Sequence, residues 1–411
     1  MVGGEISGSN GPLHGIRVLD LTRVLAGPWA SQVLGDYGAE VIKVERPETG
    51  DDTRHWGPPW RDDREGRKTK DSAYFLSANR NKRSITIDLS NPAGAGLLRD
   101  LASKCDVLME NFRVGTMRRF DLGYEDLYKI NSSMIYCSIS AYGQTGSRAD
   151  KPGYDAMIQA SGGLMSITGE LDGPPQKAGV AIADIMAGMY ATTAILGAIV
   201  ERKKSGVGQH LDVPLYDSQV AWLANQSMNY LIGGEDPKRM GTAHPNLVPY
   251  QVFKTIDGYL MLAVGNNSQF IACCECLRIP EVAVESQFAT NADRVENRDA
   301  LVTILSEAFR LQDTSYWLNA LTDCGVPAGP INSVENVLSG DYAVEREFVR
   351  TLPSADGGAV PTVANPVRFS RTPIEYQCAP PMLGEHTDEV LAELLGLDAV
   401  RIDELRGIGA I

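Results

Sequence analysis

The sequence is poor in positive charge. Its 38 Lys and Arg residues are outnumbered by 52 Asp and Glu residues, which gives a formal net charge of −14 at pH 7. Nucleic acids and anionic membranes repel a chain of this charge, so the composition argues against both as partners. An anionic ligand must instead be bound by local groups of Arg and Lys.

Cysteine and histidine are also scarce, and neither forms a recognisable pattern. The seven cysteines are an odd number in 411 residues, which does not suit a disulfide framework. The tightest group, Cys273, Cys274 and Cys276, lacks the C-x2-C spacing of zinc ligands, and the five histidines are scattered. We interpret the cysteines as small buried side chains in a reducing compartment, and we predict no metal site.

Motifs of several enzyme classes are missing. The chain contains no P-loop, no H-E-x-x-H and no G-x-S-x-G, which argues against a serine hydrolase or a metal enzyme. The turn LTRVLAGPWA after the first predicted strand lacks G-x-G-x-x-G, so a nicotinamide or flavin site is not indicated. Phosphate binding at the start of the helix after Gly27 remains open.

No targeting or membrane signal stands out. Residues 1–15 (MVGGEISGSNGPLHG) have neither the apolar core of a signal peptide nor the Arg-rich pattern of a transit peptide. We interpret this stretch as a flexible lead-in and predict a cytoplasmic protein. The most apolar segment, residues 185–200, is shorter than a membrane span of about 20 residues, so we interpret it as a buried helix of a soluble protein.

Strand and helix patterns alternate along the first part of the chain. Strand patterns occur at residues 17–21 (RVLDL), 40–45 (EVIKVE), 84–89 (SITIDL), 107–112 (VLMENF) and 134–140 (MIYCSIS). Helical patterns, such as residues 92–105, separate them. This alternation predicts an α/β fold with a doubly wound parallel sheet. The charged, Gly- and Pro-rich stretch 48–71 is predicted to be a surface loop.

The pattern changes after about residue 225. Residues 250–264 alternate around Asp257-Gly258, which is a strong hairpin signal. Helical patterns dominate the stretch that follows, and residues 388–397 form the last predicted helix. The middle of the chain therefore resembles a separate α+β domain.

Basic residues gather at the predicted strand ends. Arg46 follows the strand at 40–45, Lys82 precedes the strand at 84–89, and Arg113 follows the strand at 107–112. Ligands of open α/β sheets bind at the carboxyl ends of strands. These residues are therefore either an ordinary solvated rim or the contacts of a phosphorylated ligand.

One carboxylate interrupts the small, apolar run GVAIADIMAG at residues 179–188. Asp184 can act as the N-cap of a helix that begins at Ile185. It can also be a nucleophile, because a carboxylate that stays ionised in poorly hydrated surroundings is reactive. The pattern alone leaves both roles open. His244, in the turn-rich stretch GTAHPNLVPY, is likewise either a surface residue or a functional one.

Several long motifs resemble one protein family. They are LHGIRVLDLTRVLAGPWASQVLGDYGAEVIKVERPETGDDTR (13–54), NRNKRSITIDL (79–89), MENF (109–112), GYDAMIQASGGLMSITG (153–169), GVAIADIMAG (179–188), GVPAGPINSVENV (325–337) and LGEHTDEVL (383–391). In this order they resemble the class III CoA-transferases, the CaiB/BaiF family, along nearly the whole chain. The stretches GTAH, VPYQVFKTIDGY and GNNSQF resemble its succinyl-CoA–glutarate branch in particular.

The resemblance implies a fold and an assembly. Each subunit would have a large Rossmann-like domain with a parallel sheet and a smaller α+β domain, and two ring-shaped subunits would interlock as a homodimer. We place the N-terminal part of the large, CoA-binding domain at residues 1–220 and the small domain at residues 221–335. Residues 336–411 would be the C-terminal part that returns to the large domain.

The resemblance also implies a reaction. CoA moves from an acyl-CoA, here succinyl-CoA, to a carboxylic acid acceptor, here a dicarboxylate such as glutarate. The intermediates would be a mixed anhydride and then a CoA thioester on Asp184, which would be the nucleophile. CoA thioesters are substrates in this scheme, and neither a metal nor a permanently bound cofactor is implied.

The positions that match the family's CoA contacts are Leu25, Ala26, Arg46, Asn79, Arg80, Asn81, Lys82, Asn111, Phe112, Arg113, Arg119 and Tyr154. We further expect Arg23, Asp155, His244 and Asn246 to contact the acyl group or the acid. The formyl-CoA–oxalate branch has Gln where this chain has Leu25, and a run of glycines near His244. Both differences argue against oxalate as the acceptor.

The 2-methylacyl-CoA racemases of the same superfamily supply an alternative. They carry a catalytic His in a G-H-D context, where this chain has GYD with Tyr154. The ordinary pKa of tyrosine, about 10, makes it a poor proton carrier near neutral pH. Racemisation is therefore the second hypothesis.

Overall fold

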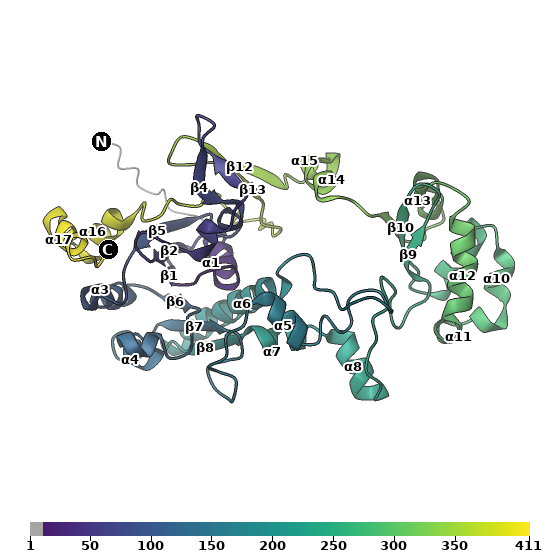
Figure 1. Ribbon diagram of the computed structural model, residues 1–411, viewed down its shortest axis with the longest axis horizontal. Helices are drawn as coiled ribbons and strands as arrows, with labels where there is room; N and C mark the ends of the chain where they lie inside the picture. The colour runs from purple at the N-terminus through teal and green to yellow at the C-terminus, as the bar shows by residue number, and fades with distance from the viewer. Residues whose placement is uncertain (1–10) are drawn as a thin grey trace. The chain divides into compact units, whose positions relative to one another are not determined.

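A computed structural model describes residues 11–411, so most of the predicted lead-in lies outside the described residues. The chain forms two compact units (Figure 1). Of the described residues, the large unit contains residues 11–164, 178–227 and 346–411, and the small unit contains residues 165–177 and 228–345. Residues 165–177, which we expected in the large domain, thus belong with the small unit.

A six-stranded parallel sheet forms the centre of the large unit. Its strands are β1 (Arg17–Asp20), β2 (Glu40–Glu45), β5 (Lys82–Thr86), β6 (Val107–Glu110), β7 (Ile135–Ser140) and β8 (His210–Pro214). They lie in the order β5-β2-β1-β6-β7-β8, and every pair is parallel. In chain order this is 3-2-1-4-5-6, the strand order of a Rossmann fold, whose direction of winding reverses between β1 and β6.

The strand predictions hold at four places and shift at the fifth. The patterns at 17–21, 40–45, 107–112 and 134–140 correspond to β1, β2, β6 and β7. The pattern at 84–89 starts too late, because β5 begins at Lys82. Lys82 and Arg83 are charged, yet both are buried in ion pairs, so their charge hid the start of a buried strand.

Helices cover both faces of the sheet (Figure 1). Successive residues of a strand point to opposite faces, so Val18 packs with α1 (Ala26–Asp36) and α6 (Ile182–Ser205), whereas Leu19 packs with α3 (Pro92–Ala102) and α16 (Thr387–Leu395). The second face is completed by α4 (Tyr124–Tyr128) and α17 (Ala399–Gly407).

Helices α1 and α6 approach each other closely. A Cβ atom on Gly188 would lie 2.5 Å from the carbonyl oxygen of Ala26. Only glycine therefore fits at this point of the apolar run that contains Asp184. The close packing places the first turn of α1 against the second turn of α6.

Helix α6 is longer than the apolar segment at 185–200 suggested, with 24 residues from Ile182 to Ser205. By length and composition it could cross a membrane. Half of its apolar window is buried, and the core helix of a soluble protein meets the same criterion. Its buried side chains, including Ala187 and Ile195, belong to the core beneath the sheet.

The charged stretch at 48–71 is not a plain loop. It contains the 3-10 helix η1 (Asp52–His55) and the antiparallel strands β3 (Trp60–Asp62) and β4 (Lys68–Ser72), and α2 (Ala73–Leu76) follows. An ion pair of 2.6 Å joins Arg61 to Asp356 in the turn between β12 (Val349–Pro353) and β13 (Ala359–Val363). The remaining elements of the large unit are η2 (Met117–Phe120), α5 (Asp155–Ser161) and α7 (Leu215–Ala221).

The small unit has its own core. The hairpin predicted around Asp257-Gly258 is confirmed as β9 (Tyr250–Lys254) and β10 (Tyr259–Ala263), and β11 (Ala328–Pro330) extends it. The other elements are α9 (Asn267–Cys276), α10 (Pro280–Val284), η3 (Ser286–Phe288), α11 (Asn291–Glu296), α12 (Arg298–Phe309), α13 (Thr314–Asp323), α14 (Val334–Ser339) and α15 (Asp341–Glu345). Cys273 and Cys274 are buried in this core, as predicted, and all seven cysteines are free. Helix α8 (Ala224–Gly233) precedes the hairpin.

Candidate active site

Asp184 is the third residue of α6, and its side chain is only 8% exposed. The helix begins at Ile182, and Ala181 occupies the N-cap position without a capping side chain. The prediction that Asp184 caps a helix beginning at Ile185 is therefore wrong. The residues before Asp184 are apolar and carry no helix-start signal, so the sequence pattern placed the start too late.

The cap of α6 comes from another helix. Asp155, the first residue of α5, accepts hydrogen bonds at Oδ1 from the backbone N–H groups of Ala183 (2.8 Å) and Asp184 (3.4 Å). Its Oδ2 accepts a 2.6 Å hydrogen bond from Nε2 of Gln159. The starts of α5 and α6 are thereby joined through one carboxylate.

The environment of Asp184 disfavours its charge. Burial, and then the neighbouring charge of Asp155, raise the pKa of Asp184 to about 7. Within residues 11–411, no hydrogen bond or ion pair to its carboxylate is present, although its backbone N–H bonds to Asp155. The amides at the start of a helix would favour the charged form, but Asp155 occupies them here. Asp184 is therefore a poorly solvated and unusually basic carboxylate.

Tyr74, on α2, lies within the electrostatic influence of Asp184 and Asp155, and sequence reasoning missed it. Burial, and then the charges of Asp184, Asp155 and Asp51, raise the pKa of Tyr74 to about 12. Its hydroxyl therefore keeps its proton and can donate a hydrogen bond. Tyr74 follows a stretch that we predicted to be a surface loop, and no motif surrounds it, so only the fold brings it to Asp184.

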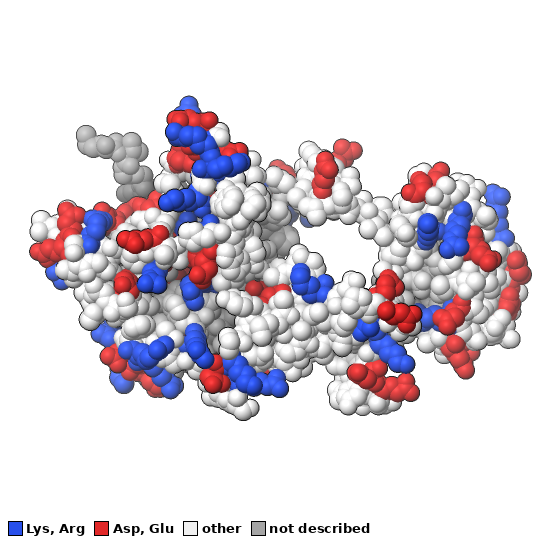
Figure 2. Space-filling view, in the orientation of Figure 1, with Lys and Arg blue, Asp and Glu red and all other residues white. Residues whose placement is uncertain are grey.

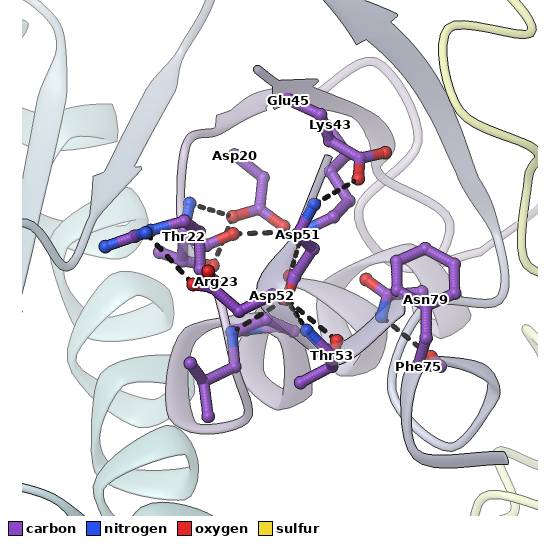
Figure 3. Close-up of polar contacts among 12 residues, drawn as sticks. Asp20, Thr22, Arg23, Lys43, Glu45, Asp51, Asp52, Thr53, Phe75 and Asn79 are labelled. Carbon is purple, nitrogen blue, oxygen red and sulfur yellow. Dashed lines mark hydrogen bonds and ion pairs between the residues drawn. The ribbon is translucent and has the colours of Figure 1, made fainter. Parts of the chain in front are cut away.

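A second polar cluster lies at the carboxyl ends of β1 and β2 (Figure 3). Lys43 Nζ donates to Asp51 Oδ2 at 2.9 Å and to the backbone oxygen of Thr22 at 2.9 Å, and both charged side chains are fully buried. Asp51 also accepts hydrogen bonds from Thr53 and from the backbone N–H of Val24. Every polar group of this cluster is directed at another protein group.

Lys82 belongs to the same strand-end cluster. Its Nζ donates to Asp20 Oδ2 (3.2 Å), to the backbone oxygen of Pro28 (3.0 Å) and to Asn79 Oδ1 (2.8 Å). These contacts use all three N–H groups of the ammonium. Burial lowers the pKa of Lys82 to about 8.

The loops that follow β1 and β6 meet at the point where the winding of the sheet reverses. The Asn111 side chain accepts from the backbone N–H of Arg23 (2.9 Å) and donates to the backbone oxygen of Arg23 (2.7 Å). The Arg23 guanidinium is exposed, lies over the Phe112 ring and pairs with Asp52 at 3.0 Å. Ligands of open α/β sheets bind in the crevice outside the strand ends at this reversal.

Comparison with known proteins identifies the family. Residues 13–387 match the family model described as CoA-transferase family III. The chain belongs to this family. It is therefore an enzyme of the class III CoA-transferases, as its motifs predicted.

Individual relatives of the family cover nearly the whole chain. A succinate–glutarate CoA-transferase of Agrobacterium fabrum is 48% identical over 383 residues, which are 93% of this chain and 96% of that protein. The human succinyl-CoA:glutarate CoA-transferase is 45% identical over 400 residues, 97% of this chain and 90% of that protein. A crystal structure of a CaiB/BaiF family protein from Brucella suis is 46% identical, with a TM-score of 0.82 over 94% of this chain and all of that one.

The expected CoA contacts of this CoA-transferase fall into two groups. Arg46, Arg113, Arg119 and Tyr154 are exposed, and Asn111 and Phe112 are half-buried. Figure 2 shows that Lys and Arg side chains are interspersed with Asp and Glu over the face in view. The buried group is Leu25, Ala26, Asn79, Arg80, Asn81 and Lys82.

The side chains of residues 79–82 are not presented to a ligand, contrary to our expectation. Arg80 and Asn81 bond to Asp36, and Asn79 and Lys82 bond to each other. The backbone N–H groups of Arg80 and Asn81 are also occupied, by Gln32 Oε1 (3.1 Å) and by the backbone oxygen of Cys378 (3.1 Å), so a ligand can meet these groups only by breaking those bonds. The sequence did not reveal these partners because Asp36 and Asp20 are distant from Arg80 and Lys82 along the chain. The two basic residues therefore looked free to bind a phosphate.

His244 and Asn246 lie in the small unit. The backbone N–H of Asn246 donates to Nδ1 of His244 at 3.0 Å, and Arg298 donates to the backbone oxygen of His244 at 2.9 Å. Burial, and then the charge of Arg298, lower the pKa of His244, so the ring is neutral near pH 7. Since Nδ1 accepts, the ring proton resides on Nε2 and is available to a ligand.

Proposed function

We propose that this CoA-transferase moves CoA from succinyl-CoA to a dicarboxylate such as glutarate, with Asp184 as the nucleophile. One observation supports the assignment of Asp184 as the nucleophile. Its carboxylate is buried, accepts no hydrogen bond within the described chain and has a pKa raised to about 7. The substrates are supported by the two succinate–glutarate CoA-transferases that are 45–48% identical over nearly the full length.

The reaction proceeds in two halves. The Asp184 carboxylate attacks the thioester carbonyl of succinyl-CoA, which forms a mixed anhydride and releases CoA thiolate. The thiolate attacks the Asp184 carbonyl, which leaves an aspartyl-CoA thioester and frees succinate. The acceptor carboxylate then attacks this thioester, and the released thiolate takes the acceptor's carbonyl, so that glutaryl-CoA leaves and Asp184 is regenerated.

The surroundings of Asp184 suit this chemistry. A poorly hydrated carboxylate does not have to shed a water shell before it attacks. The Tyr74 hydroxyl keeps its proton and donates to the oxygen that becomes negative in each tetrahedral intermediate. The small side chains of Ala183 and Ala187 add little bulk around the first turn of α6.

CoA itself is bound by the exposed basic residues at the strand ends. Arg46 follows β2 and Arg113 follows β6, so both stand where phosphates bind in folds of this type. Leu25 and Ala26, at the start of α1, contribute contacts that need no charged side chain. Arg23 binds the acyl carboxylate from the same edge of the sheet.

The active enzyme is a homodimer of interlocked subunits in the cytoplasm. Helix α8 supports the dimer, because it buries none of its residues and leaves Leu231 69% and Ile232 82% exposed. Exposed apolar surfaces of this kind typically mark protein interfaces. The racemase alternative has less support, since Tyr154 holds the position of the catalytic His.

Trapping on the enzyme tests the proposal. The protein is incubated with succinyl-CoA, quenched with hydroxylamine and digested, and the peptide containing Asp184 is examined by mass spectrometry. We expect a hydroxamate at Asp184 in the wild type and none in Asp184→Asn. Modification at another residue contradicts the assigned nucleophile.

Rates with a panel of acids identify the acceptor. With succinyl-CoA as donor, we expect glutarate to react faster than monocarboxylates of similar length. Solvent deuterium entering C2 of an acyl-CoA without any acceptor acid would instead favour racemisation.

A further inference from the structure

We propose that Asp155 is a positioning residue that tunes Asp184, by capping α6 from α5 and by holding a second negative charge beside the nucleophile. This inference rests on the proposed role of Asp184. Asp155 touches no reacting atom in this scheme; it acts through the nucleophile.

The first step concerns the helix start. Asp155 Oδ1 accepts from the N–H groups of Ala183 and Asp184, the second and third residues of α6. These amides form the positive end of the helix dipole and would otherwise stabilise a nearby carboxylate. Because Asp155 occupies them, the helix does not stabilise the ionised side chain of Asp184.

The second step concerns charge. Gln159 holds Asp155 in place, since its Nε2 donates to Asp155 Oδ2 (2.6 Å) and to the backbone oxygen of Val180 (3.5 Å). Its Oε1 accepts from the backbone N–H of Ala178 at 2.8 Å, which fixes the orientation of the amide. The Gln159 amide is neutral, so it holds the Asp155 carboxylate without bringing a positive charge to it.

The third step is the consequence for catalysis. Repulsion from Asp155 raises the free energy of the Asp184 carboxylate, and this repulsion disappears when Asp184 becomes an anhydride or a thioester. The more basic carboxylate attacks the donor thioester faster. Asp155 therefore promotes the acylation of Asp184.

Other titratable groups around Asp184 do not share this role. The charges of both carboxylates act on Tyr74 of α2, which keeps its proton near neutral pH. Helix α1, which packs along α6, carries only Asp36, at the end away from Gly188, and Arg80 pairs with it. Asp155 is the charge that acts on Asp184.

The test compares two variants that keep the cap. Asp155→Asn keeps an oxygen for the α6 amides and removes the charge. The double variant Asp155→Asn with Gln159→Glu also restores the hydrogen bond between the two side chains, because the new amide donates to the new carboxylate. It preserves the total charge but moves it away from Asp184.

We measure the rate of Asp184 acylation by succinyl-CoA from pH 5 to pH 9. In Asp155→Asn we expect the midpoint of the pH profile to fall by about one unit and the rate at pH 8 to fall about three- to tenfold. The double variant should show a midpoint below that of the wild type. If the double variant regains the wild-type midpoint and rate, Asp155 is only structural and the proposal is overturned.

Two further outcomes are decisive. If the wild type forms no adduct on Asp184, the proposed function fails, whereas a normal adduct with an unchanged profile in both variants overturns only the role of Asp155. If Asp155→Asn does not fold, the profile of the double variant alone decides the question by the same midpoint criterion.

Discussion

Asp20 and Asp184 are both buried carboxylates of the large unit, and their surroundings are opposite. Asp20 accepts hydrogen bonds from Thr22, Ser31 and Lys82. Burial acts to raise the pKa of Asp20, but the charges of Lys82 and Lys43 and these hydrogen bonds hold it below its ordinary value. Among the residues that the structure describes, Asp184 has no such partner, and its pKa rises to about 7.

This contrast separates a structural acid from a reactive one. The hydrogen-bond partners of Asp20 come from the loop after β1, from α1 and from β5, so its charge ties these three segments together. The neighbour of Asp184 is another carboxylate, so its charge destabilises the folded state and is available for chemistry. Burial alone therefore does not identify a nucleophile; the sign of the neighbouring charges does.

The largest expected effect is on activity. Asp184→Asn removes the nucleophile, and we expect CoA transfer to fall by about a thousandfold or more. Steady-state rates with succinyl-CoA and glutarate measure it. Asp20→Asn tested at permissive temperature is the matched control, because it changes a buried acid outside the reacting groups and should retain far more transfer activity per folded molecule.

The next effect is on stability. Asp20→Asn leaves Lys82 without its ion-pair partner and removes one of the negative charges near Lys43, and we expect a loss of about 3–5 kcal/mol in the free energy of unfolding. Denaturant titration at pH 7 measures it. A loss below about 1 kcal/mol would show that the strand-end cluster does not depend on this charge.

Asp184→Asn should have the opposite effect on stability. The folded-state pKa lies above the ordinary value of 3.8, so ionisation is disfavoured in the folded protein. The penalty is absent below about pH 4, grows as the pH rises and is complete above about pH 7, where it reaches up to about 4 kcal/mol. The melting temperature of Asp184→Asn should therefore exceed that of the wild type at pH 8, and the two melting temperatures should be equal at pH 4. Equal differences at both pH values would contradict an unpaired Asp184.

The smallest effect concerns Tyr74. Tyr74→Phe removes the hydroxyl that donates to the developing oxyanion, and we expect kcat to fall about ten- to a hundredfold, with little change in stability. Transfer rates and thermal unfolding measure the two quantities. An unchanged kcat would place Tyr74 outside the reaction.

Much of the fold of both units could be predicted from the sequence because the signals are local. Strand β2 (EVIKVE) is apolar and bounded by turns, and the Asp257-Gly258 hairpin carries its own turn signal. Strand β5 was misplaced because the partners of Lys82 and Arg83 are far away in the sequence. The family motifs supplied what local patterns could not, namely the expectation that Asp184 reacts.

The geometry of the site could not be predicted in the same way. The cap of α6 comes from Asp155, which lies 29 positions before Asp184. Tyr74 directly follows a segment whose composition predicts a surface loop. No sequence pattern marks a cap that is donated from another helix. Nor does any pattern show that Lys82 faces Asp20 rather than a phosphate.

The most direct test follows oxygen through the reaction. Glutarate labelled with oxygen-18 in its carboxylates is turned over with succinyl-CoA, and the enzyme is digested and examined by mass spectrometry. Because the acceptor leaves one of its oxygens on the nucleophile, the account predicts oxygen-18 in the Asp184 carboxylate. Unlabelled Asp184 after complete turnover, or label at another residue, would contradict it.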